Sequence, residues 1–161
     1  MKQNEIISKI IERFPSAVIL ITDDKQFSIT VDENDAVTAV AYMQMLDFKQ
    51  LAIITAVDWI EKGKFEIVYN LFSYEHLQQV FVKTLIDRKN PKIQSISNLW
   101  EVAGMYERDV HEFFGVEFVG NNDLRPLILH NWQDKPPMRK DFDSEAYSNK
   151  VFGNFKKEKA L

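Results

Sequence analysis

The segment Phe65-Glu-Ile-Val-Tyr-Asn-Leu-Phe72 decides the fold that this sequence predicts. Its odd-numbered positions are all large and apolar, which places those side chains on one face of an extended strand. The even-numbered positions mix the apolar Val68 and Phe72 with the polar Glu66 and Asn70. The segment is therefore predicted to be a strand of a sheet that buries one face fully and the other face partly.

Four other runs of apolar and β-branched residues predict further strands of this sheet. Leu51–Val57 precedes the segment in the chain, and Gln79–Ile86 follows it. Near the N-terminus, Ala17–Thr22 and Phe27–Val31 are separated by a short polar segment, which indicates a β-hairpin. We expect the sheet to be mostly antiparallel.

Two segments near the N-terminus have the periodicity of helices. In Asn4–Phe14 the apolar residues recur at a spacing of three to four, with charged residues on the opposite side, and Pro15 follows. Asp35–Leu46 has helical spacing and contains no glycine or proline. Both segments are predicted to be helices that pack on the sheet.

A third helical region is predicted later in the chain. Ser97 and Asn98 are candidate N-caps before an apolar run that continues to Phe114, and Gly115 is suited to end a helix. The pattern fits either one long helix or two short ones separated at Gly104.

The composition is that of one ordinary globular domain. The chain has 161 residues, of which 45% are hydrophobic, and 20 Lys and Arg against 24 Asp and Glu give a net charge of −4. The sequence contains no cysteine. This excludes disulfides, thiolate zinc sites, cysteine nucleophiles and an iron–sulfur cluster held by this chain's own thiolates. The mildly acidic balance also argues against a nucleic-acid-binding protein.

The N-terminal residues and the hydropathy pattern bear on localisation. The first ten residues mix charged and apolar side chains and lack the apolar core of a secretory signal. No apolar stretch approaches the roughly 18 residues that a membrane-spanning helix needs. We expect a cytoplasmic protein that docks onto a membrane complex.

From about Gly120 onward the periodicity fades, and turn or extended dipeptides such as Arg125-Pro126 and Pro136-Pro137 take over. This region nevertheless has many large apolar residues, which a solvated linker would lack. They are Leu124, Leu127, Ile128, Leu129, Trp132, Met138 and Phe142. The predicted fold is therefore α+β: residues 1–119 form a body of mostly antiparallel sheet with helices packed on it, and residues 120–161 form an extended C-terminal tail that docks on a partner subunit.

The charged run Tyr106–Glu112 lies on the predicted third helix and admits three interpretations. Glu107 and His111 are four residues apart, as are Arg108 and Glu112, so the run fits an ion-paired helix face. It also fits a metal or acid–base site, although the second histidine of the H-E-x-x-H zinc motif is missing. The third interpretation is a charged face that docks on a partner.

Three basic residues of the tail follow rigid or turn-forming segments. Arg125 precedes Pro126, and Arg139 and Lys140 follow the Pro-Pro pair. A guanidinium on a stiffened backbone loses less entropy when it binds, which suits a docking clamp, and the alternative is a solvated basic surface. His76 and His130 are predicted to be solvated or structural, and no glycine-rich nucleotide loop is present.

Several short motifs, taken in series, resemble one protein family. They are Leu51–Asp58, Phe65–Ser73, Ser95–Trp100, Tyr106–Asp109, Glu112–Gly115, Asp123–Arg125 and Pro137–Phe142. In this order they resemble the C-type subunit of complex I, the cofactor-free small subunit of the peripheral arm of NADH-quinone oxidoreductases. The family is shared with energy-converting, membrane-bound [NiFe] hydrogenases and formate hydrogenlyases.

The sequence departs from the usual pattern of this family at three places. Glu-Arg-Asp at 107–109 replaces Glu-Arg-Glu, Asn121 stands where a histidine is usual, and Asp-Lys-Pro-Pro at 134–137 replaces a Gly-His-Pro sequence. These departures make a hydrogenase or an archaeal-type relative a candidate beside the quinone-using branch.

The resemblance implies a structural subunit that binds and stabilises a large catalytic subunit, for electron transfer coupled to ion translocation. That partner would be the D-type large subunit of complex I or the large subunit of a [NiFe] hydrogenase, with a small iron–sulfur subunit nearby. Iron–sulfur clusters and a quinone or nickel–iron site would belong to these partners, and none to this chain. The complex would place the chain on the cytoplasmic side of the membrane, as a peripheral subunit.

The predicted docking residues come from the third helix and the tail. They are Glu107, Arg108, Asp109, His111, Glu112, Asp123, Leu124, Arg125, Pro137, Arg139, Lys140 and Asp141. The rival hypothesis is a stand-alone enzyme that uses Glu107, Asp109 and His111 as acid–base or metal-binding groups.

Overall fold

A computed structural model describes residues 2–153 and has a five-stranded sheet at its centre. The strands are β1 (Val18–Ile21), β2 (Gln26–Val31), β3 (Gln50–Trp59), β4 (Lys64–Ser73) and β5 (Gln78–Asp87). They lie in the order β1-β2-β5-β4-β3, and every neighbouring pair is antiparallel except β2 and β5. The predicted α+β class with a mostly antiparallel sheet is confirmed.

The alternation in β4 has the predicted consequence for burial. The side chains of Phe65, Ile67, Tyr69 and Leu71 are fully buried on one face of the strand. On the other face, Val68 is buried and its polar neighbours are half-buried. One face of the strand therefore supplies the core, as the sequence pattern predicts.

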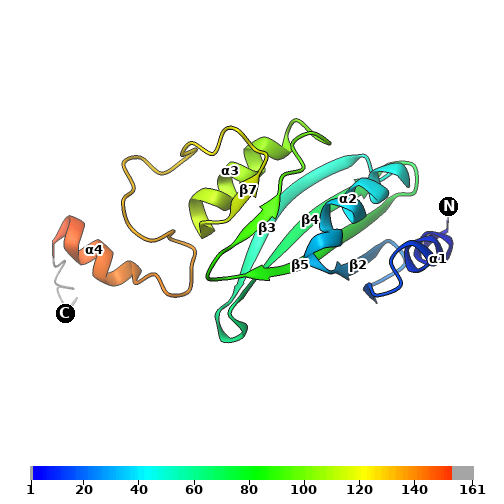
Figure 1. The fold of residues 1–161 in the computed structure, drawn as a ribbon, viewed down its shortest axis with the longest axis horizontal. Helices are drawn as coiled ribbons and strands as arrows, with labels where there is room; N and C mark the ends of the chain where they lie inside the picture. The colour runs from blue at the N-terminus through cyan, green and yellow to red at the C-terminus, as the bar shows by residue number, and fades with distance from the viewer. Residues whose placement is uncertain (1, 154–161) are drawn as a thin grey trace, which may run out of the picture.

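Two helices complete this core. α1 (Gln3–Arg13) buries Ile6 and Ile10, and α2 (Ala36–Met45) buries Val40 and Met43 together with two alanines. A short 3-10 turn, η1 (Glu33–Asp35), leads into α2. Figure 1 shows α2 lying over one face of the sheet, with α1 at one end of the molecule.

The third helix is shorter than the predicted long helix, and the first of the two predicted short helices is absent. α3 spans Ala103–Phe114, and the chain before it, around Ser97 and Asn98, forms turns, so these two residues are not its N-caps. The indole Nε1 of Trp100 donates to the carbonyl oxygen of Lys49 at 2.7 Å, which fixes the turn segment against the body. Gly104 lies inside the first turn of α3 and marks no break.

Besides η1, four short elements within residues 2–153 were not predicted. They are η2 (Ile60–Lys62), β6 (Lys92–Gln94), β7 (Glu117–Val119) and α4 (Ser144–Phe152). β6 and β7 form a parallel two-stranded sheet beside α3. α4 lies in the predicted tail, at the end of the molecule opposite to α1 (Figure 1).

Between β7 and α4 the chain runs past α3 without regular secondary structure (Figure 1). Three aromatic rings join this segment to α4: Trp132, Phe142 and Tyr147 lie with ring centroids 4.5–5.7 Å apart. Asp143 caps α4 by accepting a hydrogen bond from the amide of Ala146. Residues 154–161 of the predicted tail lie outside the described residues. Docking of the tail on a partner stays a prediction.

Candidate partner-docking site

The exposed side of α3 holds the backbone of the tail. Arg108 donates from Nε to the carbonyl oxygen of Arg125 at 2.9 Å and from Nη2 to that of Pro126 at 3.0 Å. One turn further along, Glu112 accepts hydrogen bonds from three consecutive amides, those of residues 127–129. The i,i+4 spacing predicts an ion pair between these two side chains, but each of them binds the tail instead.

Glu107 lies inside the fold, which corrects its assignment to a docking face. Its side chain is fully buried. One carboxylate oxygen accepts from the amide of Ile96 at 2.7 Å, and the other accepts from Ser95 Oγ at 2.7 Å and Asn121 Nδ2 at 2.8 Å. Burial raises the pKa of Glu107 although these bonds favour the charged form. The residue therefore joins α3 to the segments that follow β6 and β7.

Asp109 and His111 occupy the neighbouring positions of α3, and both are half-buried. Burial, and then the negative charge of Glu112, raise the pKa of Asp109, and within the described residues no side-chain hydrogen bond or ion pair compensates its charge. His111 Nδ1 lies 2.8 Å from the carbonyl oxygen of Val116, so that nitrogen carries the proton. Asp109 is thus the carboxylate of α3 that is best placed to meet a partner.

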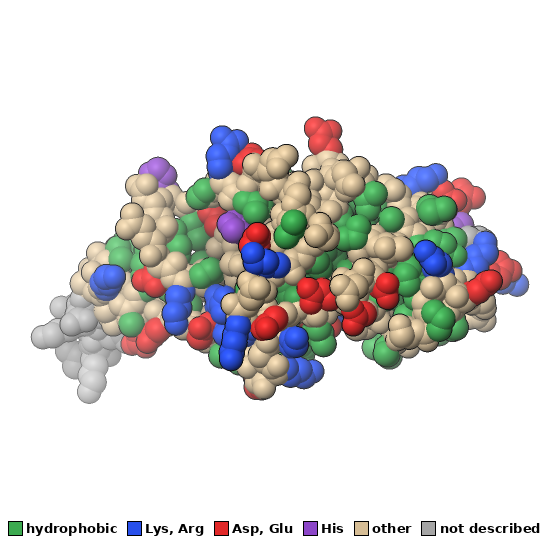
Figure 2. All heavy atoms as spheres, in the orientation of Figure 1, with side chains coloured by type: hydrophobic (Ala, Val, Ile, Leu, Met, Phe, Trp, Pro, Cys, Tyr) green, Lys and Arg blue, Asp and Glu red, His purple; other side chains and the backbone are tan. Residues whose placement is uncertain are grey.

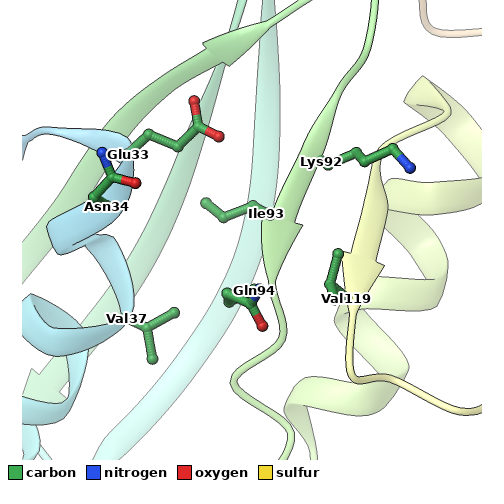
Figure 3. Close-up of a pocket in the computed structure, with 7 residues that line it drawn as sticks. All are labelled: Glu33, Asn34, Val37, Lys92, Ile93, Gln94 and Val119. Atoms are coloured by element: carbon green, nitrogen blue, oxygen red, sulfur yellow. The ribbon is translucent and has the colours of Figure 1, made fainter.

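Two hollows of about 250 Å³ each bear on the rival enzyme hypothesis. One lies between the end of α3 and the tail, and its lining includes His111, Glu112 and Trp132. The other lies between β6 on one side and η1 with the start of α2 on the other (Figure 3). Ile93 points from β6 toward α2, and Glu33 is the one carboxylate of the lining. Neither hollow brings together the acid–base residues of that hypothesis. Within residues 2–153, no group of three His, Cys, Asp or Glu side chains could hold a metal.

A second charged cluster fastens the end of the tail to the sheet. Asp58, at the end of β3, accepts two hydrogen bonds from Arg88, at 2.7 and 2.9 Å, and a third from the amide of Lys140 at 2.8 Å. Arg88 also reaches Asp141 at 2.5 Å. The guanidinium of Arg139 lies 5.1 Å from the ring centroid of Phe65. In the space-filling view, acidic and basic side chains alternate in this region, between the body and α4 (Figure 2).

This cluster changes the interpretation of the basic tail residues. Arg139 is mostly buried against its own chain and pairs with Asp141. The side chain of Lys140 is half-exposed, with Nζ 3.8 Å from Glu61. Arg125 is largely exposed and pairs with Asp123, whose pKa this hydrogen bond lowers. Arg125 therefore remains accessible to a partner although it pairs with Asp123, whereas Arg139 is mostly buried within the chain.

The other two predicted docking residues are Leu124, near the start of the tail, and Pro137, shortly before Arg139 of the charged cluster. Leu124 is half-buried and packs against the hydrophobic core, and Pro137 is half-buried. Sequence patterns missed Arg88, which is 30 residues from its main partner, Asp58. An arginine directly after a strand carries no local feature that distinguishes it from a surface charge.

The contacts of Asp141 predict that the attachment of the tail to the sheet weakens at acidic pH. Burial pushes the pKa of Asp141 upward, but hydrogen bonds from Arg88 and Arg139 outweigh this effect and bring the pKa to about 2, below the ordinary 3.8. A carboxyl group whose pKa is lower in the folded chain stabilises the fold at pH values above its ordinary pKa. This stabilisation is lost as the pH falls toward the folded pKa of about 2. Urea unfolding should therefore show wild type more stable than Asp141→Asn at neutral pH, with the difference shrinking below pH 4. A difference that grows in acid would contradict this.

Comparison with known proteins places the chain among subunits of respiratory membrane complexes. The family described as "Respiratory-chain NADH dehydrogenase, 30 Kd subunit" matches residues 29–148, and the chain belongs to this family. In the solved structure of the membrane-bound sulfane sulfur reductase, an archaeal respiratory membrane complex, one chain superposes with a TM-score of 0.88 at 33% identity. The match covers 96% of this chain and 93% of that one. The predicted relation to the C-type subunit of complex I is confirmed.

Curated relatives differ in how much of their own length the chain spans. It is 28% identical to the C-type subunit of F(420)H(2) dehydrogenase from Methanosarcina mazei, over 96% of this chain and 99% of that protein. It is 39% identical to the mitochondrial NADH-ubiquinone oxidoreductase 30.4 kDa subunit of Neurospora crassa, over 72% of this chain but only 41% of the relative. The C/D-type NADH-quinone oxidoreductase subunit of Bacteroides thetaiotaomicron is 35% identical over 74% of this chain and 24% of its own length. Within residues 2–153, none of the helices is long and apolar enough to cross a membrane.

Proposed function

We propose that this chain is a structural subunit of a complex-I-like or energy-converting [NiFe] hydrogenase-type complex, and that it binds and stabilises the large catalytic subunit. The observation that carries the proposal is the α3–tail arrangement. Arg108 and Glu112 bind the tail through its main chain, which leaves Leu127 and Ile128 facing outward. A relative whose name joins the C and D types supports a D-type large subunit as the partner.

The chemistry of the complex is assigned to the other subunits. A chain without cysteine supplies no thiolate for an iron–sulfur cluster. We assign the clusters, and the quinone or nickel–iron site, to the large subunit and a small iron–sulfur subunit. This chain would hold the large subunit in position on the cytoplasmic side of the membrane, where electron transfer is coupled to ion translocation.

Removal of the tail tests this proposal. A chain that ends at Gly120 is expected to bind the large catalytic subunit about a hundredfold more weakly or worse, since permanent complexes bury more than roughly 2,000 Å². A chain that ends at Gly153 is the matched control and should bind as the full chain does. Binding is measured by surface plasmon resonance with the large subunit immobilised.

Circular dichroism of both shortened chains accompanies the binding measurement, because Asn121 and the Lys140 amide also bond to the body. A folded chain ending at Gly120 that binds with undiminished affinity would contradict the proposal. If that chain does not fold, full-length variants of the exposed tail residues answer the same question.

A further inference from the structure

The tail segment 125–129 is held in one conformation by two charged side chains. Arg108 donates hydrogen bonds to two successive carbonyl oxygens, and Glu112 accepts hydrogen bonds from the three amides that follow them. Consecutive main-chain amides that bind an anionic group form a nest, and here the bound anion is the carboxylate of Glu112. Charge-assisted hydrogen bonds of this kind are roughly twice as strong as neutral ones. The main-chain groups of this segment are therefore held by side chains of α3.

The side chains of the segment divide into an inward and an outward set. Leu124 packs against the core, and Leu129 is half-buried over the hollow beside α3. Leu127 and Ile128 project outward, with exposed fractions of 38% and 65%. Exposed apolar surface of this kind gains nothing for the isolated fold, because burial is what makes an isoleucine side chain stabilising.

An ordered loop with an exposed apolar tip has the properties of a preformed anchor. Fixing the backbone of a residue costs about 1–2 kcal/mol at 25 °C, and a loop that is already fixed does not incur this cost again when it binds. Interface hot spots are the side chains that fill desolvated pockets on the partner. Other apolar side chains are equally exposed, such as Leu20 and Leu77, but no pair of charged side chains holds the backbone around them.

We propose that Ile128, assisted by Leu127, is the apolar anchor that this chain inserts into an apolar pocket of the large catalytic subunit. The inference rests on the proposed function and names the residue that carries the binding. The large subunit is the chosen partner because a relative's name joins the C and D types, so that a C-type unit and a D-type unit occur in one chain there. The neighbouring Arg125–Asp123 ion pair is internally neutral, so the anchor itself selects an apolar surface rather than a charged one.

The test uses full-length variants and the large catalytic subunit of the native complex, immobilised for surface plasmon resonance. Ile128→Asp is expected to weaken binding by about a hundredfold or more, and Ile128→Ala by about tenfold. The matched control is Leu77→Asp, since Leu77 is 63% exposed and has a positive φ of 51° that aspartate tolerates. That control should bind as wild type does, and all three variants should keep the wild-type melting temperature.

The outcomes separate this inference from the proposed function. Wild-type affinity for Ile128→Asp, together with weak binding by a folded chain ending at Gly120, would overturn the anchor and leave the docking tail intact. An equal loss for Ile128→Asp and Leu77→Asp would also overturn the anchor. Failure of the unmodified chain to bind the large subunit would overturn both.

Discussion

Replacing Asp58 by asparagine is expected to lower the free energy of unfolding by about 3 kcal/mol, because removal of one partner from a buried ion pair leaves the other charge uncompensated. The Asp58 side chain is only 2% exposed and that of Arg88 13%. The carboxylate also receives the Lys140 amide, so the variant loses a contact that fastens the tail to the sheet. Urea denaturation, followed by tryptophan fluorescence, measures the change.

The direction of the Asp58 pKa agrees with this expectation. Burial alone would raise the pKa of Asp58, but the hydrogen bonds from Arg88 and Lys140 and the nearby positive charges outweigh burial and lower it. The matched control is Asp47→Asn, which removes the exposed Asp47–Lys49 pair at a position of positive φ that asparagine tolerates. That variant should unfold as wild type does. Equal stability of the Asp58 and Asp47 variants would contradict a structural role for the buried pair.

Replacing Glu107 by leucine is expected to lower the free energy of unfolding by about 2–4 kcal/mol. The amide of Ile96 would lose its acceptor in a buried place, and Ser95 and Asn121 would each lose a partner. Each buried donor left without an acceptor costs about 1–3 kcal/mol, partly offset because a buried charge is removed as well. Thermal unfolding followed by circular dichroism measures the loss.

Glu107→Gln isolates the charge from the shape of the side chain. Burial raises the pKa of Glu107 above its ordinary 4.5, so the folded chain binds the proton more tightly than the unfolded chain does. The stability of wild type relative to Glu107→Gln should therefore increase as the pH falls from 7 toward 4.5, and this advantage should disappear as the pH rises through the folded pKa. A relative stability that falls in acid would show that the folded structure prefers the charged carboxylate.

Strong periodicity made much of the fold predictable from the sequence. β4 and its neighbours have alternating or β-branched residues over ten positions. α1 has a clear apolar face, and α2 is apolar over most of its length. β6 and β7 span only three residues each, and their parallel pairing joins segments far apart in the chain. Such short runs have no measurable period, so local patterns do not predict them.

The start of α3 and the presence of α4 depend on contacts that local patterns do not contain. The indole of Trp100 binds the Lys49 carbonyl, which keeps the residues before Ala103 in turns although they are suited to a helix. α4 has no buried residue, and its tie to the rest of the tail is one aromatic cluster. A nine-residue helix that buries none of its side chains needs no strong apolar periodicity in the sequence.

Three residues of the charged run on α3 make contacts within the chain that its spacing does not predict. Its spacing indicates side chains that face one another or a partner, whereas Glu107 turns inward and Arg108 and Glu112 bind main-chain groups of the tail. A sequence motif does not predict which main-chain groups a side chain will bind, because nearly every residue carries the same N–H and C=O groups. The partner contacts of Asp109 and Arg125 stay predictions.

Affinity purification of the tagged chain from its native host in mild detergent, with quantitative mass spectrometry of the co-purifying proteins, tests most directly whether the chain is a structural subunit. We expect a large catalytic subunit, of the complex I D type or the [NiFe] hydrogenase type, in equimolar amount, together with a small iron–sulfur subunit. Recovery of the chain without any large catalytic subunit would contradict the proposed function.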